Sequence, residues 1–141
     1  MEPQQTLDLA DLHPTIQGAS AGLLRNRYYA EAIFEAFKRV ELRVRELSGL
    51  ELSGQRLMAA ALDGDPPIIS VASEAGASGR DEQIGFRLML MGAMTGIRNP
   101  KAHEVVDQQD PVTTMEYLAF ASLLLSRLDG ATIVRPAPQA G

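Results

Sequence analysis

The chain of 141 residues contains no cysteine and no tryptophan. The lack of cysteine excludes a disulfide scaffold, a zinc site built on thiolates and a cysteine nucleophile. With only two histidines as well, the chain offers few ligands for a zinc or iron site, so we expect neither a metal nor another cofactor. Aromatic residues make up 5% of the chain. A hydrophobic core must therefore come from leucine, alanine, methionine, isoleucine and valine.

Long apolar runs are also missing, since none approaches the ~20 residues that a transmembrane helix needs. Residues 1–5 are polar and lack the basic segment that opens a secretory signal, so we expect a cytoplasmic protein without membrane contact. The hydrophobic fraction of 45% is typical of a folded protein. The length suits one domain, which we place at residues 1–130, followed by a flexible tail at 131–141.

Positive charge is in deficit, with 13 basic and 18 acidic side chains giving a net charge of −5. This balance argues against tight, unselective binding of nucleic acid, which depends on neutralising many phosphates. The distribution is uneven, because residues 25–56 hold seven basic and five acidic side chains. A small cleft for one or two phosphates remains compatible with this composition.

Hydrophobic periodicity predicts an all-α protein, a four-helix bundle with short extra helices and a mobile loop near residues 63–80. Apolar residues at steps of three and four mark the longest helix, and Gly49 stops it. The predicted helices cover residues 14–24, 28–47, 53–62, 81–97 and 113–128, with a brief extended piece at 68–71 and a loop at 72–80. His13 is expected to play a structural part where the first helix begins.

Two helices carry features that suggest further packing. In the helix at 81–97, Ile84, Leu88, Met91 and Thr95 fall on one line, and three glycines lie near a second line. Because glycine weakens a helix by roughly 1 kcal/mol, such a line makes sense if another backbone packs there. The helix at 113–128 is apolar around much of its circumference, which favours burial against both the bundle and a second subunit.

One segment combines an arginine and a histidine around a predicted helix break. Asn99 precedes Pro100, so the helix ends or kinks there, and Asn99 can cap a new helical turn. The break can bring Arg98 and His103 to one cleft. An arginine can hold a phosphate through two donors, and a histidine can move protons near neutral pH. This pair suits metal-free cleavage of RNA. The structural alternative is that Arg98 pairs with a carboxylate and His103 caps or packs.

The segment Arg98-Asn99…His103 resembles the signature of the HEPN superfamily, which places an arginine, a polar residue and a histidine at the end of a bundle helix. Features along the chain more closely resemble the Ymh-type proteins of bacteria and phages. They span roughly residues 7–130 and include Leu12-His13-Pro14, Tyr29-Ala30-Glu31-Ala32, Glu82-Gln83 with Gly85-Phe86, Ile97-Arg98-Asn99-Pro100, Ala102-His103-Glu104 and Glu116-Tyr117-Leu118-Ala119.

The HEPN resemblance implies a homodimeric endoribonuclease with a composite Arg/His site, acting as a toxin or as an effector of abortive infection. RNA would be the substrate, the product would end in a 2′,3′-cyclic phosphate, and an antitoxin or defence partner would control the activity. Arg98 would bind the phosphate, His103 would act as acid or base and Asn99 would orient the site. Weaker supporting candidates are Lys38, Glu41 and Lys101. Two alternatives stay open: a non-catalytic dimeric interaction module and a nucleotide-binding regulator.

Overall fold

The computed structural model describes residues 8–98 and 110–134. This part of the chain is mostly helical, which confirms the all-α prediction. A short 3₁₀ turn at Leu9–Asp11 precedes the main elements. These elements are α1 (Pro14–Arg25), α2 (Tyr29–Ser48), α3 (Gly54–Leu62), β1 (Ile69–Ser70), α4 (Gly76–Ala93), α6 (Pro111–Asp129) and β2 (Thr132–Ile133).

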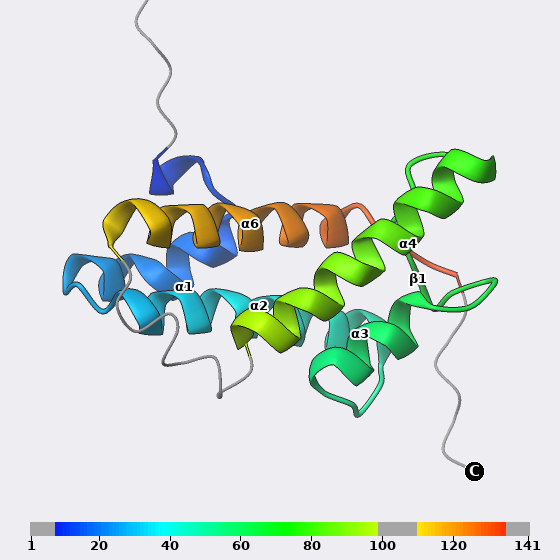
Figure 1. Ribbon diagram of the computed structural model, residues 1–141, viewed down its shortest axis with the longest axis horizontal. Coiled ribbons are helices and arrows are strands. Elements are labelled where there is room, and N and C mark those ends of the chain that lie inside the picture. The colour runs from blue at the N-terminus through cyan, green and yellow to red at the C-terminus, as the bar shows by residue number, and fades with distance from the viewer. Residues whose placement is uncertain (1–7, 99–109, 135–141) are drawn as a thin grey trace, which may run out of the picture.

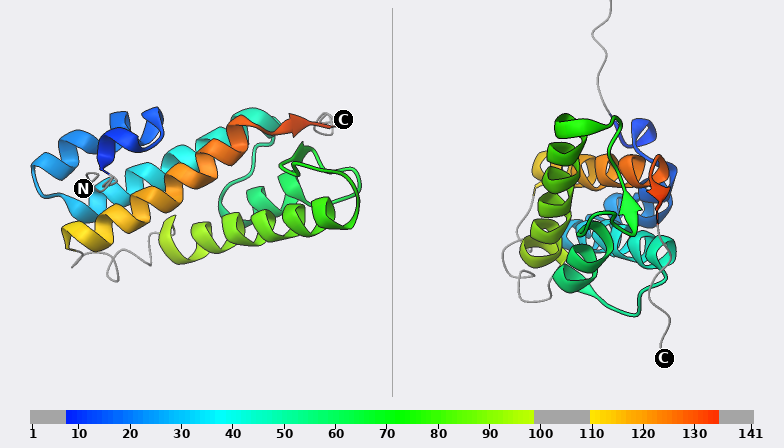
Figure 2. Two further views of the ribbon diagram at one scale, coloured as in Figure 1. Left: turned by 90° about the horizontal axis from the view of Figure 1, so that it is seen from above. Right: turned by 90° about the vertical axis from the view of Figure 1, so that its right-hand side faces the viewer.

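The central pair of helices is α2 and α6, which lie side by side along the long axis of the molecule (Figures 1 and 2). Helix α1 packs against α2 toward one end, and α3 packs against α4 toward the other. Fully buried residues of α2 recur at the spacing of one helical face: Ile33, Phe37, Val40 and Val44. The Phe37 ring meets the Phe120 ring of α6 at a centroid distance of 6.0 Å.

Local signals in the sequence set most of the helix ends. Pro14 occupies the first turn of α1, and the His13 side chain caps that turn by accepting a hydrogen bond from the Thr15 amide. Gly49 ends α2 in the left-handed conformation at φ 72°. At α6, Asp110 accepts a hydrogen bond from the Thr113 amide at 2.7 Å. The observed bounds of α1, α2, α3 and α6 therefore lie within one to two residues of the predicted bounds.

The prediction of a loop at 72–80 is wrong for residues 76–80, because α4 begins at Gly76. The glycines and serine there have low helix propensity, and tertiary packing overrides it. Gly79 is buried, and a Cβ atom at this position would lie 1.9 Å from the carbonyl oxygen of Glu74. The first turns of α4 therefore depend on a close approach between backbones that hydrophobic periodicity does not reveal.

The short strands β1 and β2 form an antiparallel pair in which Ile69 lies opposite Ile133. The Val134 amide extends the pairing by donating to the Ile68 carbonyl at 2.8 Å. The extended piece predicted at 68–71 thus contains β1. The boundary of the predicted flexible tail at 131–141 needs correction, because residues 132–133 are a strand held against the rest of the fold.

The line of apolar residues predicted along α4 is partly exposed in the structure. Ile84 and Leu88 are 44% and 55% exposed, whereas the buried side chains of this segment are Leu90, Ala93 and Met94. A Cβ atom added to the nearby glycines would meet no atom within 4 Å among the described residues, at Gly85, Gly92 and Gly96 alike. Within this part of the chain, no backbone packs against the glycine line.

Candidate functional site

The helix that leads to the Arg/His segment ends in an unusual turn. After Ala93 the backbone passes into a π-helical turn, Met94–Arg98, which brings Arg98 to the last described position before residue 110. Met94 is buried and anchors the turn against the core. Single π turns within or at the end of α-helices are rare overall, but those that occur are often found at functional sites. The turn therefore marks Arg98 independently of the sequence motif.

Arg98 lies beside a buried carboxylate from the middle of α2. Its Nε atom is 3.8 Å from Oε1 of Glu41, a residue that is only 8% exposed. Nη2 of Arg45, one turn further along α2, is 3.9 Å from the same oxygen. The other carboxylate oxygen, Oε2, accepts a hydrogen bond of 2.7 Å from the Gly54 amide at the start of α3. Glu41 thus joins three elements at one point.

The guanidinium of Arg98 retains unused hydrogen-bonding capacity. Its Nε atom is buried, and it has no hydrogen-bond partner among the described residues, since 3.8 Å to Glu41 is an ion-pair distance only. Buried polar groups in folded proteins are almost always hydrogen-bonded. An orphaned donor next to a cavity is consistent with a site that is completed by an acceptor such as a phosphate oxygen.

The cavity beside Arg98 has a volume of about 400 Å³. Its polar lining includes a second cross-link, in which the Thr95 hydroxyl donates to Oε1 of Gln55 at 3.2 Å. Small-molecule sites commonly occupy a few hundred Å³ and place a small number of polar groups on such walls. The residues that line the cavity are Glu41, Ser53, Gly54, Gln55, Met94, Thr95 and Arg98.

Of the residues singled out in the sequence, the structure brings Arg98 and Glu41 together. Lys38 is exposed one turn before Glu41 on α2, and no contact joins it to Arg98. The other three, Asn99, Lys101 and His103, lie outside the described residues. The close pairing of Arg98 with a carboxylate is also what the structural alternative expects.

Sequence reasoning missed the remaining partners in this cluster. Arg45 follows Glu41 at i+4, a spacing that predicts a pair on one helix face. Thr95 and Gln55 carry no comparable signal, because they belong to different helices and meet only through the packing of the π turn on α3. The buried position of Glu41 within the apolar stripe of α2 is the signal that singles it out.

His13, the other histidine of the chain, has a structural place far from this cluster. Its Nδ1 atom accepts from the Thr15 amide at 3.1 Å, which leaves Nε2 to donate to Asp129 Oδ2 at 2.6 Å. Asp129 is also 3.6 Å from Nε of Arg43. Because both ring nitrogens are occupied, His13 ties the start of α1 to the end of α6, as expected for a boundary residue.

Residues 10–128 match a protein-family model described as "Protein of unknown function (Hypoth_ymh)". The chain belongs to the Hypoth_ymh family. This match covers most of the chain and includes both Glu41 and Arg98. Comparisons with curated proteins and with solved structures found no match.

The Hypoth_ymh assignment agrees with the Ymh-type resemblance of the sequence and leaves the wider HEPN relationship as a proposal. Among the described residues, no group of three or more histidine, aspartate or glutamate side chains is placed to hold a metal ion. No helix in residues 8–98 or 110–134 has the length and apolar character to cross a membrane.

Proposed function

We propose that this protein is a metal-independent endoribonuclease of the HEPN type, acting as a toxin or as an effector of abortive infection. The observation that carries the proposal is the orphaned buried Nε of Arg98 beside a cavity of about 400 Å³. A guanidinium binds phosphate oxygens through charge-assisted hydrogen bonds and stabilises the negative charge that grows in the transition state. Arg98 is the phosphate-binding residue in this proposal.

Glu41 supports this role as a positioning residue. Its carboxylate is fixed by the Gly54 amide and lies between Arg98 and Arg45. Two cations around one anion leave a net positive charge for the scissile phosphate. A guanidinium held in place before binding loses less conformational entropy when the phosphate arrives.

The proposed reaction is an in-line attack by the neighbouring ribose hydroxyl. A base takes the proton of the 2′-hydroxyl, the 2′-oxygen bonds to phosphorus, and the bond from phosphorus to the 5′-oxygen breaks. An acid gives a proton to the leaving 5′-oxygen, so the products carry a 2′,3′-cyclic phosphate and a 5′-hydroxyl. By the HEPN resemblance, His103 and the partner subunit's His103 are the base and the acid, and Asn99 orients the site.

A homodimer is part of the proposal because α4, which carries Arg98 into its final turn, has an exposed apolar face. Spacings of three and four residues put six positions on this face, and those with large side chains are 36–55% exposed. Gly96 precedes Arg98 by two residues, so a second chain on this face would end near the turn that carries Arg98, whose side chain projects from the opposite side of the helix toward Glu41. Three large side chains and three glycines share this face, and the glycines would let a second helix approach closely: Ile84, Gly85, Leu88, Met89, Gly92 and Gly96.

The test is cleavage of a labelled, structured RNA in the presence of EDTA. We expect the wild type to cut it and the new 3′ ends to carry 2′,3′-cyclic phosphates. Arg98→Ala and His103→Ala should each lower the rate by at least about 100-fold, the usual effect of removing a charge-stabilising group or an acid-base group. Arg56→Ala, which removes an exposed arginine of α3, is the matched control and should cut like the wild type.

Circular dichroism should show unchanged helicity for all three variants, which separates loss of chemistry from loss of folding. Cleavage that requires an added metal ion, or that survives both Arg98→Ala and His103→Ala, would overturn the proposal.

The exposed face of α4 also favours a second candidate, a non-catalytic dimeric interaction module in which Glu41 simply neutralises Arg98. That protein would leave RNA intact and would retain a partner in pull-down experiments despite Arg98→Ala.

A further inference from the structure

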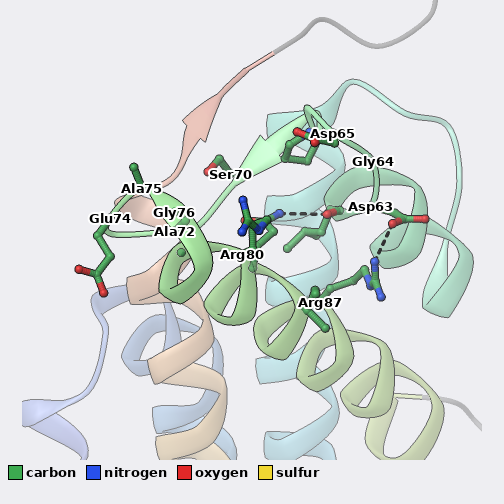
Figure 3. Close-up of a pocket in the computed structure, with 15 residues that line it drawn as sticks. Asp63, Gly64, Asp65, Ser70, Ala72, Glu74, Ala75, Gly76, Arg80 and Arg87 are labelled. Carbon is green, nitrogen blue, oxygen red and sulfur yellow. Dashed lines mark hydrogen bonds and ion pairs between the residues drawn. The ribbon is translucent and has the colours of Figure 1, made fainter.

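A second cavity, of about 550 Å³, lies at the opposite end of α4 from Arg98. It is formed between the first half of α4 and the segment that links α3 to α4 (Figure 3). Its central arginine, Arg80, is 18 residues before Arg98, or roughly 27 Å along a helix that rises 1.5 Å per residue. The two cavities are therefore separate sites, and the volume of this one suits a small organic molecule.

The walls of this cavity are held in place by the side chain of Gln83. Its Oε1 atom accepts from the Val71 amide at 2.8 Å. Its Nε2 atom donates to the Leu62 carbonyl at 3.0 Å and to the Ile69 carbonyl at 2.8 Å. One side chain thus ties the end of α3 and strand β1 to α4. Because the amide of Gln83 makes all three bonds within the fold, this side chain stabilises the wall and is not free to bind a ligand.

A second clamp holds the adjoining stretch. Glu82 accepts hydrogen bonds from both the amide and the hydroxyl of Ser73. Arg127 of α6 lies 2.7 Å from Glu82 Oε2, donates to the Val71 carbonyl at 2.6 Å and stacks 4.6 Å from the centre of the Phe86 ring. The segment over the cavity is therefore pinned at several points, which gives a pre-formed site and lowers the entropic cost of binding.

Several polar groups in the lining are not used by the fold, among them the carboxylates of Asp65 and Glu74 and the side chain of Arg80, all three of which belong to exposed residues. Neither the Arg80 guanidinium nor the Ser70 hydroxyl has a hydrogen-bond or ion-pair partner among the described residues. In Figure 3, Arg80 rises from α4 into the space between Ser70 and Asp63. Arg87, by contrast, is bound to Asp63 at 2.6 Å. The apolar part of the wall comes from Leu62, Pro67, Ala72 and Ile84.

The charges around the cavity select among anions. Arg80 is the one lining cation without an ion-pair partner in the described chain, while Asp65 and Glu74 add negative charge to the lining. The Glu74 carboxylate points away from the centre in Figure 3. The lining charges outside the Arg87–Asp63 pair sum to one negative charge, so they disfavour a dianion more strongly than a ligand with one negative charge, which Arg80 alone can pair.

We propose that this cavity binds a small organic monocarboxylate with an apolar body. The planar carboxylate accepts two parallel hydrogen bonds from Arg80, a geometry that guanidinium groups favour, and a further one from Ser70. The apolar body lies against the wall of aliphatic side chains.

The test titrates the full chain with 4-phenylbutyrate and with its uncharged amide, 4-phenylbutyramide, by calorimetry and by amide shifts in NMR spectra. We expect saturable binding of the carboxylate, with shifts concentrated at β1 and the first half of α4, and at least tenfold weaker binding of the amide. Inorganic phosphate alone, which lacks the apolar body and is largely dianionic at pH 7.5, should not compete.

Arg80→Gln should weaken carboxylate binding about tenfold and leave amide binding unchanged. Arg25→Gln, at an exposed arginine that ends α1, is the matched control and should bind like the wild type, as should Arg98→Ala. The proposal is overturned if carboxylate and amide bind equally, if Arg80→Gln binds like Arg25→Gln, or if the carboxylate shows no saturable binding. Because RNA cleavage is not measured, the outcome is independent of the ribonuclease proposal.

Discussion

Replacing Glu41 tests whether this residue holds α2, α3 and the π turn together. Its Oε2 atom accepts from the Gly54 amide at 2.7 Å, and its Oε1 atom lies 3.8 Å from Arg98 and 3.9 Å from Arg45. Glu41→Ala removes every one of these interactions and leaves the amide without its carboxylate acceptor. Glu41→Gln keeps an oxygen for the amide and removes only the charge.

The expected magnitudes follow from these geometries. A hydrogen bond to a charged acceptor contributes about 1.5–3 kcal/mol. The two ion pairs add about 0–1 kcal/mol each, because they are long and their arginines are 28% and 36% exposed. We therefore expect Glu41→Ala to lower the free energy of unfolding by about 2–4 kcal/mol, and Glu41→Gln by about 1 kcal/mol.

Urea denaturation measures both changes. With a slope of about 2 kcal/mol per molar urea, the midpoint should fall by about 1–2 M for Glu41→Ala and by about 0.5 M for Glu41→Gln. Glu46→Ala is the control on the same helix, because Glu46 is 70% exposed and makes one surface pair with Arg43 at 3.5 Å. It should change stability by less than about 0.5 kcal/mol. The reasoning is refuted if Glu41→Ala resembles Glu46→Ala, or if Glu41→Gln destabilises as much as Glu41→Ala.

His13→Ala removes a helix cap and the bond to Asp129, so thermal unfolding should show a loss of about 1–2 kcal/mol. Leu88→Glu charges the outward face of α4, so sedimentation should show a dimer for the wild type and a monomer for the variant; a wild-type monomer at micromolar concentration would contradict the homodimer. The Ser73 amide lowers the pKa of the Glu82 carboxyl, so this stabilisation is present at neutral pH and is lost as the pH falls through the lowered pKa. The stability difference between wild type and Glu82→Gln, followed by urea titration, should therefore shrink in acid.

Helix positions were largely predictable, because their signals are local. Pro14 and Gly49 mark the start of α1 and the end of α2 through the backbone angles that they allow. The start of α4 was not predictable in this way. Gly79 reads as a loop residue, yet the fold uses it because the Glu74 carbonyl leaves no room for a side chain. Helix propensity depends on local sequence and cannot predict such a contact.

The candidate site was predictable as a set of residues more than as an arrangement. The Arg98 segment stands out by composition, whereas Glu41 was only a weaker supporting candidate whose burial on α2 is seen in the structure. Their contact joins positions 57 residues apart and depends on how the π turn packs on α2. Nothing in the sequence indicates the cavity around Arg80. Gln83 holds its walls by bonding to backbone amides and carbonyls, which every residue type provides.

The π turn at Met94–Arg98 has a consequence for insertions and deletions. A π turn holds one residue more than the α-helical turn that it replaces, so it acts like a single inserted residue. Deleting one residue from it would restore α-helical pitch and rotate everything beyond by about 100°. Arg98 would then leave the side of the helix that meets Glu41, while the buried contacts of Leu90 and Ala93 stayed in register. A one-residue deletion at this turn would therefore change the direction of the Arg98 side chain without removing the buried contacts that stabilise α4.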